Sequence, residues 1–223
     1  MVDAAEKKGV ILAVGHVERF NPAMDYLEEH RTKTLFIEAH RLAKYPPPRI
    51  GMPRRGTEVS VVLDLMIHDL DLILSLVKSE VEQIEAFGAA VLSETEDIVN
   101  ARLTFKNGTV ANVTASRVSP EPMRKIRAFY RDSYASMDYG SHSGKVCRKS
   151  AQGSERETVE LNEKNALGEE LENFISCVAE TMKNGGKGIK QPKVSGKDGL
   201  KALELAKKIA DAVQAHQKKY FNS

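Results

Sequence analysis

The sequence has few features that would place it in a specialised class of protein. It contains only two cysteines, Cys147 and Cys177, and no CxxC motif, which excludes a disulfide-stabilised scaffold and a zinc ribbon. No apolar run reaches the roughly 20 residues that a membrane span requires, and the N-terminus has no signal-peptide pattern. Neither sign of charge dominates, because 33 Lys and Arg stand against 31 Asp and Glu. We therefore expect a soluble, cytoplasmic protein without a nucleic-acid or membrane partner.

The first twenty residues have the pattern of the edge of a domain. Residues 2–8 are typical of the last two turns of a helix, which Gly9 can close. Residues 10–15 are apolar at every position, as in a strand that is covered on both faces of a parallel α/β sheet. The rest of the chain has no second unit of this kind. We interpret residues 1–20 as the remnant of a domain whose body the sequence does not contain; the alternative is that the strand joins the downstream sheet.

The remaining 203 residues (21–223) predict an α+β domain with an open, mostly antiparallel sheet and helices on one face. Asn21 is the expected N-cap of the first helix of this domain, and Ser195 and Asp198 form a capping box in front of the last one. Helices are predicted at 22–29, 59–77, 167–182 and 195–213, and strands at 34–42, 81–92, 97–106, 109–117, 125–138, 144–149 and 156–161.

The strand at 109–117 has apolar residues on both sides, with Ala111 and Val113 on one side and Val110 on the other. A sheet that is apolar on both faces needs helices on one face and a further chain on the other. We therefore expect a homo-oligomer, a dimer or a tetramer, that forms through the open face of the sheet.

The helix at 59–77 is apolar apart from one narrow stripe. At 100° per residue the stripe falls in a wedge roughly 80° wide and consists of Ser60, Asp64, His68, Asp71 and Ser75. Asp64 and His68 are spaced i and i+4, so a carboxylate can orient an imidazole and raise its basicity, as a general base requires. Two other interpretations stay open. The stripe can be the solvated face of a buried helix, or Asp64, His68 and Asp71 can be the metal ligands of a hydrolase, although a second histidine is missing.

Three segments, in this order, resemble the glucose–fructose oxidoreductase/inositol dehydrogenase/MocA family. They are residues 7–22, which contain His16-Val17-Glu18-Arg19-Phe20-Asn21-Pro22, residues 62–71 with the Asp-x-x-x-His motif, and residues 195–204. The resemblance covers nearly the whole chain. It implies a protein that transfers a hydride between NAD or NADP and a carbon of a sugar, cyclitol or sugar nucleotide.

By this resemblance His68 is the catalytic acid/base, and Asp64 assists it or binds substrate hydroxyls. Asp71, in the same stripe, is expected to bind substrate as well. Arg41, on the strand before a proline-rich loop, is expected to meet an anionic group of the substrate. That loop, Lys44–Ile50, resembles members that act on nucleotide-linked sugars.

The resemblance places His16 near the nicotinamide, just past the carboxyl end of the predicted strand, which is where ligands bind to parallel sheets. Arg19 and Asn21 are expected to line the same crevice. These three residues are our candidates for contacts with the cofactor.

Two motifs of the family are missing from the sequence. It has no G-x-G-x-x-G loop, on which a dinucleotide pyrophosphate normally rests, and no Glu-Lys-Pro motif with its catalytic lysine. We therefore expect this chain alone to bind NAD(P) poorly and to be inactive. The alternative is a non-catalytic binding or oligomerisation module derived from the family.

Overall fold

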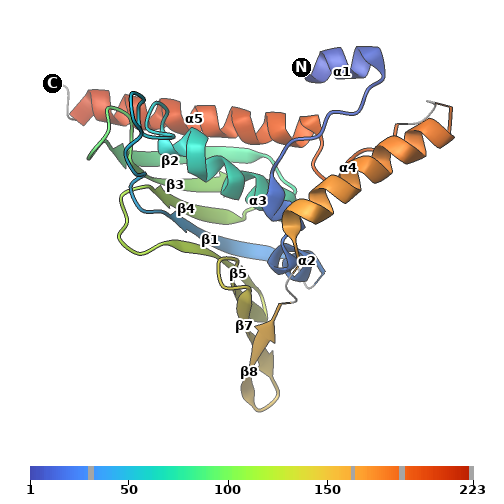
Figure 1. Ribbon diagram of the computed structural model, residues 1–223. Coiled ribbons are helices and arrows are strands. Elements are labelled where there is room, and N and C mark those ends of the chain that lie inside the picture. The colour runs from blue at the N-terminus through green and yellow to red at the C-terminus, as the bar shows by residue number, and fades with distance from the viewer. Residues whose placement is uncertain (30–32, 162–163, 186–188, 221–223) are drawn as a thin grey trace.

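The computed structural model describes residues 1–29, 33–161, 164–185 and 189–220. A single eight-stranded sheet organises the chain, in the order β2-β3-β4-β1-β5-β6-β7-β8 (Figure 1). β1 and β4 are parallel, and every other neighbouring pair is antiparallel. The predicted α+β class with an open, mostly antiparallel sheet is confirmed.

The strands are β1 (Thr34–Leu42), β2 (Val81–Ala89), β3 (Ile98–Phe105), β4 (Val110–Ser116), β5 (Met123–Tyr130), β6 (Ser133–Asp138), β7 (Ser143–Ser150) and β8 (Gly153–Glu160). The helices are α1 (Val2–Lys8), α2 (Pro22–Glu29), α3 (Ile67–Val77), α4 (Ala166–Lys183) and α5 (Gly196–Tyr220), with a 3₁₀ turn η1 (Val17–Phe20) and a π turn η2 (Val62–Met66). No helix in the described ranges is both long enough and apolar enough to cross a membrane.

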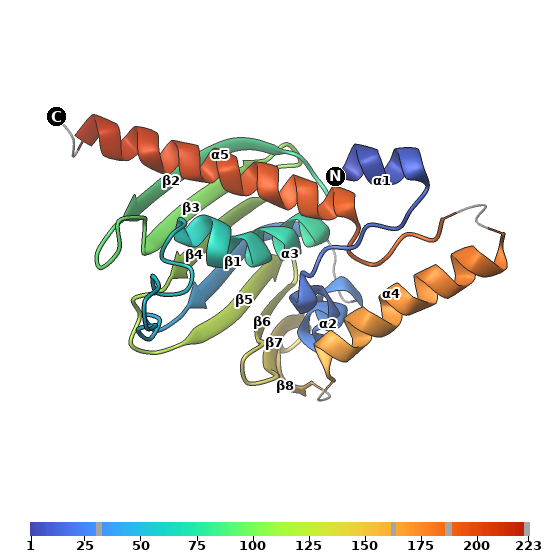
Figure 2. The same ribbon diagram turned by 45° about the horizontal axis from the view of Figure 1, so that its top comes forward.

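One face of the sheet is covered by α3 and α5, which lie side by side across it (Figure 2). The central strands alternate accordingly: Ile37 and Ala39 of β1 and Val113 of β4 are buried under these helices, while the residues between them face the other side. α3 is apolar almost all round because it packs against the sheet and also against α5. The other face carries no helix in either view of the described chain.

The predicted strand at residues 10–15 is not formed. Ala13 makes one isolated bridge to Ser195, and the segment otherwise runs as extended chain beside the start of α5. The side chains of Leu12 and Val14 pack on Gly196 and Gly199 of that helix, so closely that a Cβ at either glycine would collide with them. The apolar run therefore covers a helix end, and it joins neither a parallel sheet nor the downstream sheet.

Two other predictions needed correction. The single strand predicted at 125–138 is two strands, β5 and β6, which reverse at Arg131 and Asp132 without a glycine to mark the turn. The helix predicted at 59–77 begins later and opens with the π turn η2 before it continues as α3. At the far end of the sheet β7 and β8 form a hairpin that extends away from the rest of the chain (Figure 1).

Candidate active site

The π turn η2 controls where Asp64 points. A π turn contains more residues than an α turn, so side chains at i and i+4 are not stacked as they are in an α-helix. The Asp64 carboxylate packs against Gly56, where a Cβ would collide with it, and Gly56 has a φ of 79° that favours glycine. No hydrogen bond or ion pair joins Asp64 to His68, both of which lie in the described part of the chain. The predicted pairing within the helix is therefore absent.

The loop that carries Gly56 is held by a buried ion pair. Arg117 (1% exposed) donates from Nε to Asp97 Oδ1 at 2.7 Å and from Nη1 to the carbonyl oxygens of Gly56 and Val59. Burial by itself would raise the pKa of Asp97, but the hydrogen bond from Arg117 and backbone amides from residues 92–93 lower it well below its usual value. This pair fixes the approach to η2 and, through Gly56, the surroundings of Asp64.

His68 is half-buried on the first turn of α3. Its Nδ1 atom is buried and has no hydrogen-bond partner among the described residues, so the ring has unused hydrogen-bonding capacity. Burial lowers the pKa of His68, and the positive charge of Arg41 and the neighbouring His16 lower it further, against the opposite effect of Asp69 and Glu18. The lowered pKa favours the neutral form of the ring, which is the form that accepts a proton.

Arg41, at the end of β1, has internal partners. Its Nε lies 2.6 Å and its Nη2 3.4 Å from the two oxygens of Asp69, and its Nη1 lies 3.4 Å from Glu18 Oε1. The hydroxyl of Tyr139 donates to Asp69 Oδ1 at 2.7 Å. Burial would lower the pKa of Arg41, but Asp69, followed by Tyr139 and Glu18, raises it. The positive charge of Arg41 is therefore balanced by carboxylates of the chain itself, without a substrate anion. The same network fastens α3 to the sheet.

Glu18 connects η1 to the same network. Its Oε1 also lies 3.4 Å from Nη1 of Arg124 on β5, and its Oε2 accepts from Asn21 Nδ2 at 3.3 Å. Asn21 is the N-cap of α2 as predicted, since its Oδ1 accepts from the amide of Ala23 at 3.0 Å. Both ends of the Asn21 side chain are thus used inside the chain, although the residue was a candidate for the cofactor crevice.

The carboxylate–imidazole pair of this site joins two segments that are far apart in the sequence. His16 Nδ1, just before η1, lies 3.4 Å from Oδ2 of Asp71 on α3. Arg19 Nη1 lies 3.5 Å from both oxygens of the same carboxylate. Glu170 of α4 also lies near this cluster, because its side chain is next to Gly15. Burial raises the pKa of Glu170, and the neighbouring His16 acts in the opposite direction. The structure therefore brings together His16 and Arg19, which were candidates for the cofactor, and Asp71, which was a candidate for the substrate. His68 adjoins them, with a distance of 5.4 Å between its ring centroid and that of His16.

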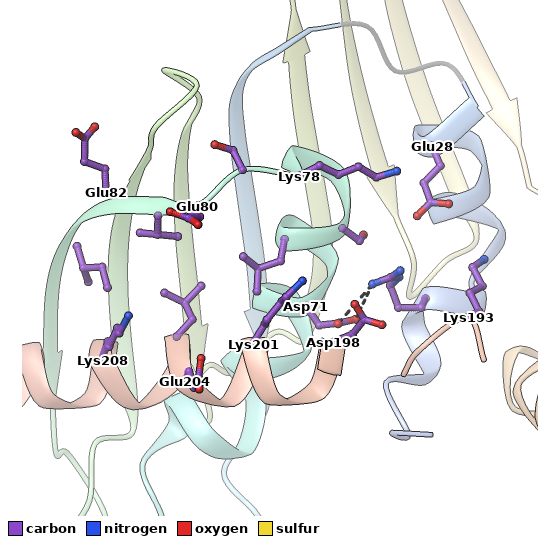
Figure 3. Close-up of a pocket in the computed structure, with 17 residues that line it drawn as sticks. Glu28, Asp71, Lys78, Glu80, Glu82, Lys193, Asp198, Lys201, Glu204 and Lys208 are labelled. Carbon is purple, nitrogen blue, oxygen red and sulfur yellow. Dashed lines mark hydrogen bonds and ion pairs between the residues drawn. The ribbon is translucent and has the colours of Figure 1, made fainter. Parts of the chain in front are cut away.

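A cleft of about 1030 Å³ opens beside this cluster (Figure 3). Asp71 lies between the Glu28 and Lys193 side and the Glu82 and Lys208 side of the cleft, with dashed lines to the guanidinium of Arg19. Lys201 and Glu204 of α5 face Lys78 and Glu80 across it. Carboxylates and amines alternate along the α5 wall, through Asp198, Lys201, Glu204 and Lys208. Asp71, which is only 1% exposed, borders this cleft and also contacts His16.

Sequence reasoning missed Glu18, Tyr139 and Glu170. Glu18 lies inside the first quoted motif, but nothing in the pattern indicates that it receives two arginines. Tyr139 and Glu170 follow the motif residues by 70 or more positions, and only the fold brings them near. In the described ranges no group of three His, Cys, Asp or Glu side chains converges as metal ligands do, so the structure gives no support to a metal hydrolase built on Asp64, His68 and Asp71.

Residues 33–132, which contain the Asp-x-x-x-His motif, Arg41 and Asp69, match the GFO/IDH/MocA C-terminal domain. The chain is also 36% identical over 186 residues to UDP-N-acetylglucosamine 3-dehydrogenase from Acidithiobacillus ferrooxidans, over 80% of this chain and 57% of the relative. The chain belongs to the GFO/IDH/MocA family. A solved structure of the A. ferrooxidans enzyme superposes with a TM-score of 0.84 at 34% identity, over 96% of this chain and 65% of that one.

A further member of the family is more distant. Myo-inositol 2-dehydrogenase from Thermotoga maritima is 27% identical and is matched over 92% of this chain and 63% of its own length. The chain thus spans between half and two thirds of each of these relatives.

Proposed function

We propose that this chain is the substrate-side portion of an oxidoreductase that transfers a hydride between NAD or NADP and a hydroxyl-bearing carbon of a sugar or sugar nucleotide. The observation that carries the proposal is His68, a half-buried imidazole with a free Nδ1 and a lowered pKa, on the family's Asp-x-x-x-His motif. Oxidation of a hydroxyl requires a base to take its proton, and a neutral imidazole within reach of substrate supplies one. The printed names of the relatives, a UDP-N-acetylglucosamine 3-dehydrogenase and a myo-inositol 2-dehydrogenase, support this class of substrate.

In this proposal each residue has a limited task. His68 takes the hydroxyl proton. Asp64, held by the Gly56 loop, accepts hydrogen bonds from neighbouring substrate hydroxyls. The network of Arg41, Asp69 and Tyr139 keeps α3 fixed on the sheet, so that the imidazole does not shift.

The residues present do not fit a dinucleotide. Asn21 is occupied as an N-cap, Arg19 pairs with Asp71, and no glycine-rich loop precedes a helix in the sequence. We therefore derive no step through NAD(P) on these residues and propose that a second domain holds it, of which residues 1–20 are the end. The exposed apolar side chains of α4 support such a neighbour; they are Leu167, Leu171, Phe174, Ile175 and Met182.

The test is a titration of the isotope-labelled chain with UDP-N-acetylglucosamine, followed by amide NMR. We expect the amide signals of residues 64–71 to shift, and the His68→Gln variant to bind more weakly. His40→Gln is the matched control, because His40 lies on β1 and faces away from α3. If millimolar UDP-N-acetylglucosamine leaves residues 64–71 unshifted, the proposed substrate site is wrong. Where this sequence occurs joined to a dinucleotide-binding domain, His68→Ala should lower kcat by about 10²–10⁴-fold.

A second function, self-association, is favoured by the uncovered face of the sheet. Phe36, Phe129 and Tyr134 form a cross-strand aromatic cluster there, with ring centroids 5.5 and 4.8 Å apart. Aromatic clusters at a surface are typical of protein interfaces. We propose a homo-oligomer through this face, for which Phe129→Glu should lower the mass measured by light scattering; a chain that is monomeric before the change would contradict the proposal.

A further inference from the structure

The contact between His16 and Asp71 is almost completely buried. His16 is 6% exposed and Asp71 is 1% exposed. The 3.4 Å between Nδ1 and Oδ2 is just beyond hydrogen-bond length, and Nδ1 makes no other hydrogen bond among the described residues. The Asp71 carboxylate thus contacts both the His16 imidazole and the Arg19 guanidinium.

The ring of His16 stands edge-on to the ring of His68, with an interplanar angle of 60°. His16 comes from the N-terminal segment and His68 from α3, so this contact links the two parts of the chain that adjoin the proposed reaction site. A tilt of the His68 ring toward the N-terminal segment would bring it closer to His16. His16 in turn is held from behind by Asp71.

We propose that Asp71 and His16 form a carboxylate–imidazole dyad that positions the His68 ring. The proposal rests on the proposed function, in which His68 takes the substrate proton, and it makes His16 and Asp71 positioning residues. A carboxylate beside a histidine selects one tautomer, here with the proton on Nδ1 and directed at Asp71. The ring so fixed presents its remaining edge to His68.

The charged groups around His68 come from several elements. Arg41 on β1 and His16 on the N-terminal segment lower its pKa, while Asp69 on its own helix and Glu18 on η1 raise it. Around His16 the facing groups are Asp71 on α3, Arg19 on η1 and Glu170 on α4. Arg41 is paired with Asp69 and Glu18 and makes no ion pair with Asp71 among the described residues. His16, which contacts both Asp71 and His68, is therefore the neighbour through which a change at Asp71 can reach His68.

The experiment is NMR of the histidine side chains in the full chain, labelled with ¹⁵N and ¹³C. In the unchanged protein we expect the ¹⁵N shifts of His16 to show the Nδ1–H tautomer. Asp71→Asn, which keeps the size of the side chain and removes its charge, should abolish that preference. In a pH titration His16→Gln should raise the pKa of His68, whereas the control His40→Gln should leave it in place.

Two results overturn the proposal. One is an Nε2–H tautomer for His16 in the unchanged protein, a measurement that needs no variant and so does not depend on whether a variant folds. The other is a His68 titration curve that His16→Gln leaves unmoved. Neither readout needs turnover or a bound sugar. If the dyad is found but UDP-N-acetylglucosamine does not bind, the proposed function fails and the dyad stands. If UDP-N-acetylglucosamine binds but His16 shows the Nε2–H tautomer, the dyad fails and the proposed function stands.

Discussion

The contact between Arg41 and Asp69 offers the sharpest test of how α3 is held. Arg41 is 5% exposed and Asp69 is fully buried, and the Nε–Oδ2 distance is 2.6 Å. Asp69→Ala leaves a buried guanidinium with only Glu18 at 3.4 Å. Removing one partner of a buried ion pair costs about 3–5 kcal/mol. With an m value of about 3 kcal/mol/M, the midpoint of urea unfolding should fall by roughly 1–1.7 M.

The matched control removes the whole polar group. Tyr139 donates to Asp69 at 2.7 Å, so a variant that replaces the ion pair alone leaves a buried hydroxyl without an acceptor, which costs about 1–3 kcal/mol. The triple variant Arg41→Met, Asp69→Leu, Tyr139→Phe leaves none of the three groups and should recover most of the loss. Urea unfolding followed by circular dichroism compares the unchanged protein, Asp69→Ala and the triple variant. A loss below about 1 kcal/mol for Asp69→Ala would mean that water reaches Arg41, and binding of a substrate anion by Arg41 would again be the better interpretation.

Three further predictions concern His68, the N-terminal segment and the cofactor. The pKa of the His68 imidazole is lowered in the folded chain, so the unfolded chain binds a proton at His68 more readily. The contribution of His68 to the free energy of unfolding is therefore fully present above the ordinary histidine pKa of 6.5 and declines as the pH falls below that value. His68→Gln should flatten the dependence of Tm on pH between about pH 7 and pH 5, and an unchanged slope would show that His68 is not the group responsible. Gly199→Ala places a Cβ 2.6 Å from Val14 Cγ2. The amides of residues 10–15 should therefore exchange hydrogen faster than in the unchanged protein, while the amides of β3 should not. If the amides of residues 10–15 exchange at the same rate in both proteins, Val14 moves aside freely. Calorimetric titration with NAD should show no binding to this chain, and micromolar affinity would refute our interpretation of residues 1–20.

The alternation of apolar residues predicted most of the sheet, because burial on one face imposes a period of two on each strand. β3 shows this plainly, with Val99, Ala101 and Leu103 buried under the helices. The capping box was equally local: Ser195 and Asp198 bond to each other and to each other's amides. The order of the strands was not predictable in this way, because the parallel pairing of β1 with β4 connects segments about 75 residues apart and leaves no local signal.

The site shows a different limit of sequence reasoning. The stripe on residues 59–77 identified the polar groups of an apolar helix, but the pairing of Asp64 with His68 assumed α-helical geometry through every turn. The π turn at Val62–Met66 removes that assumption and leaves Asp64 against Gly56. The imidazole that does face a carboxylate of the stripe is His16, 55 positions before Asp71. Both side chains are buried, and burying a polar or charged group without a partner costs free energy. We therefore expect each of the two residues to destabilise the fold when the other is replaced. A variant in which His16 and Asp71 are exchanged therefore tests the pair more stringently than either single change: if the contact is what stabilises the two buried groups, the exchanged pair should unfold at a higher urea concentration than the less stable of the single variants His16→Asp and Asp71→His.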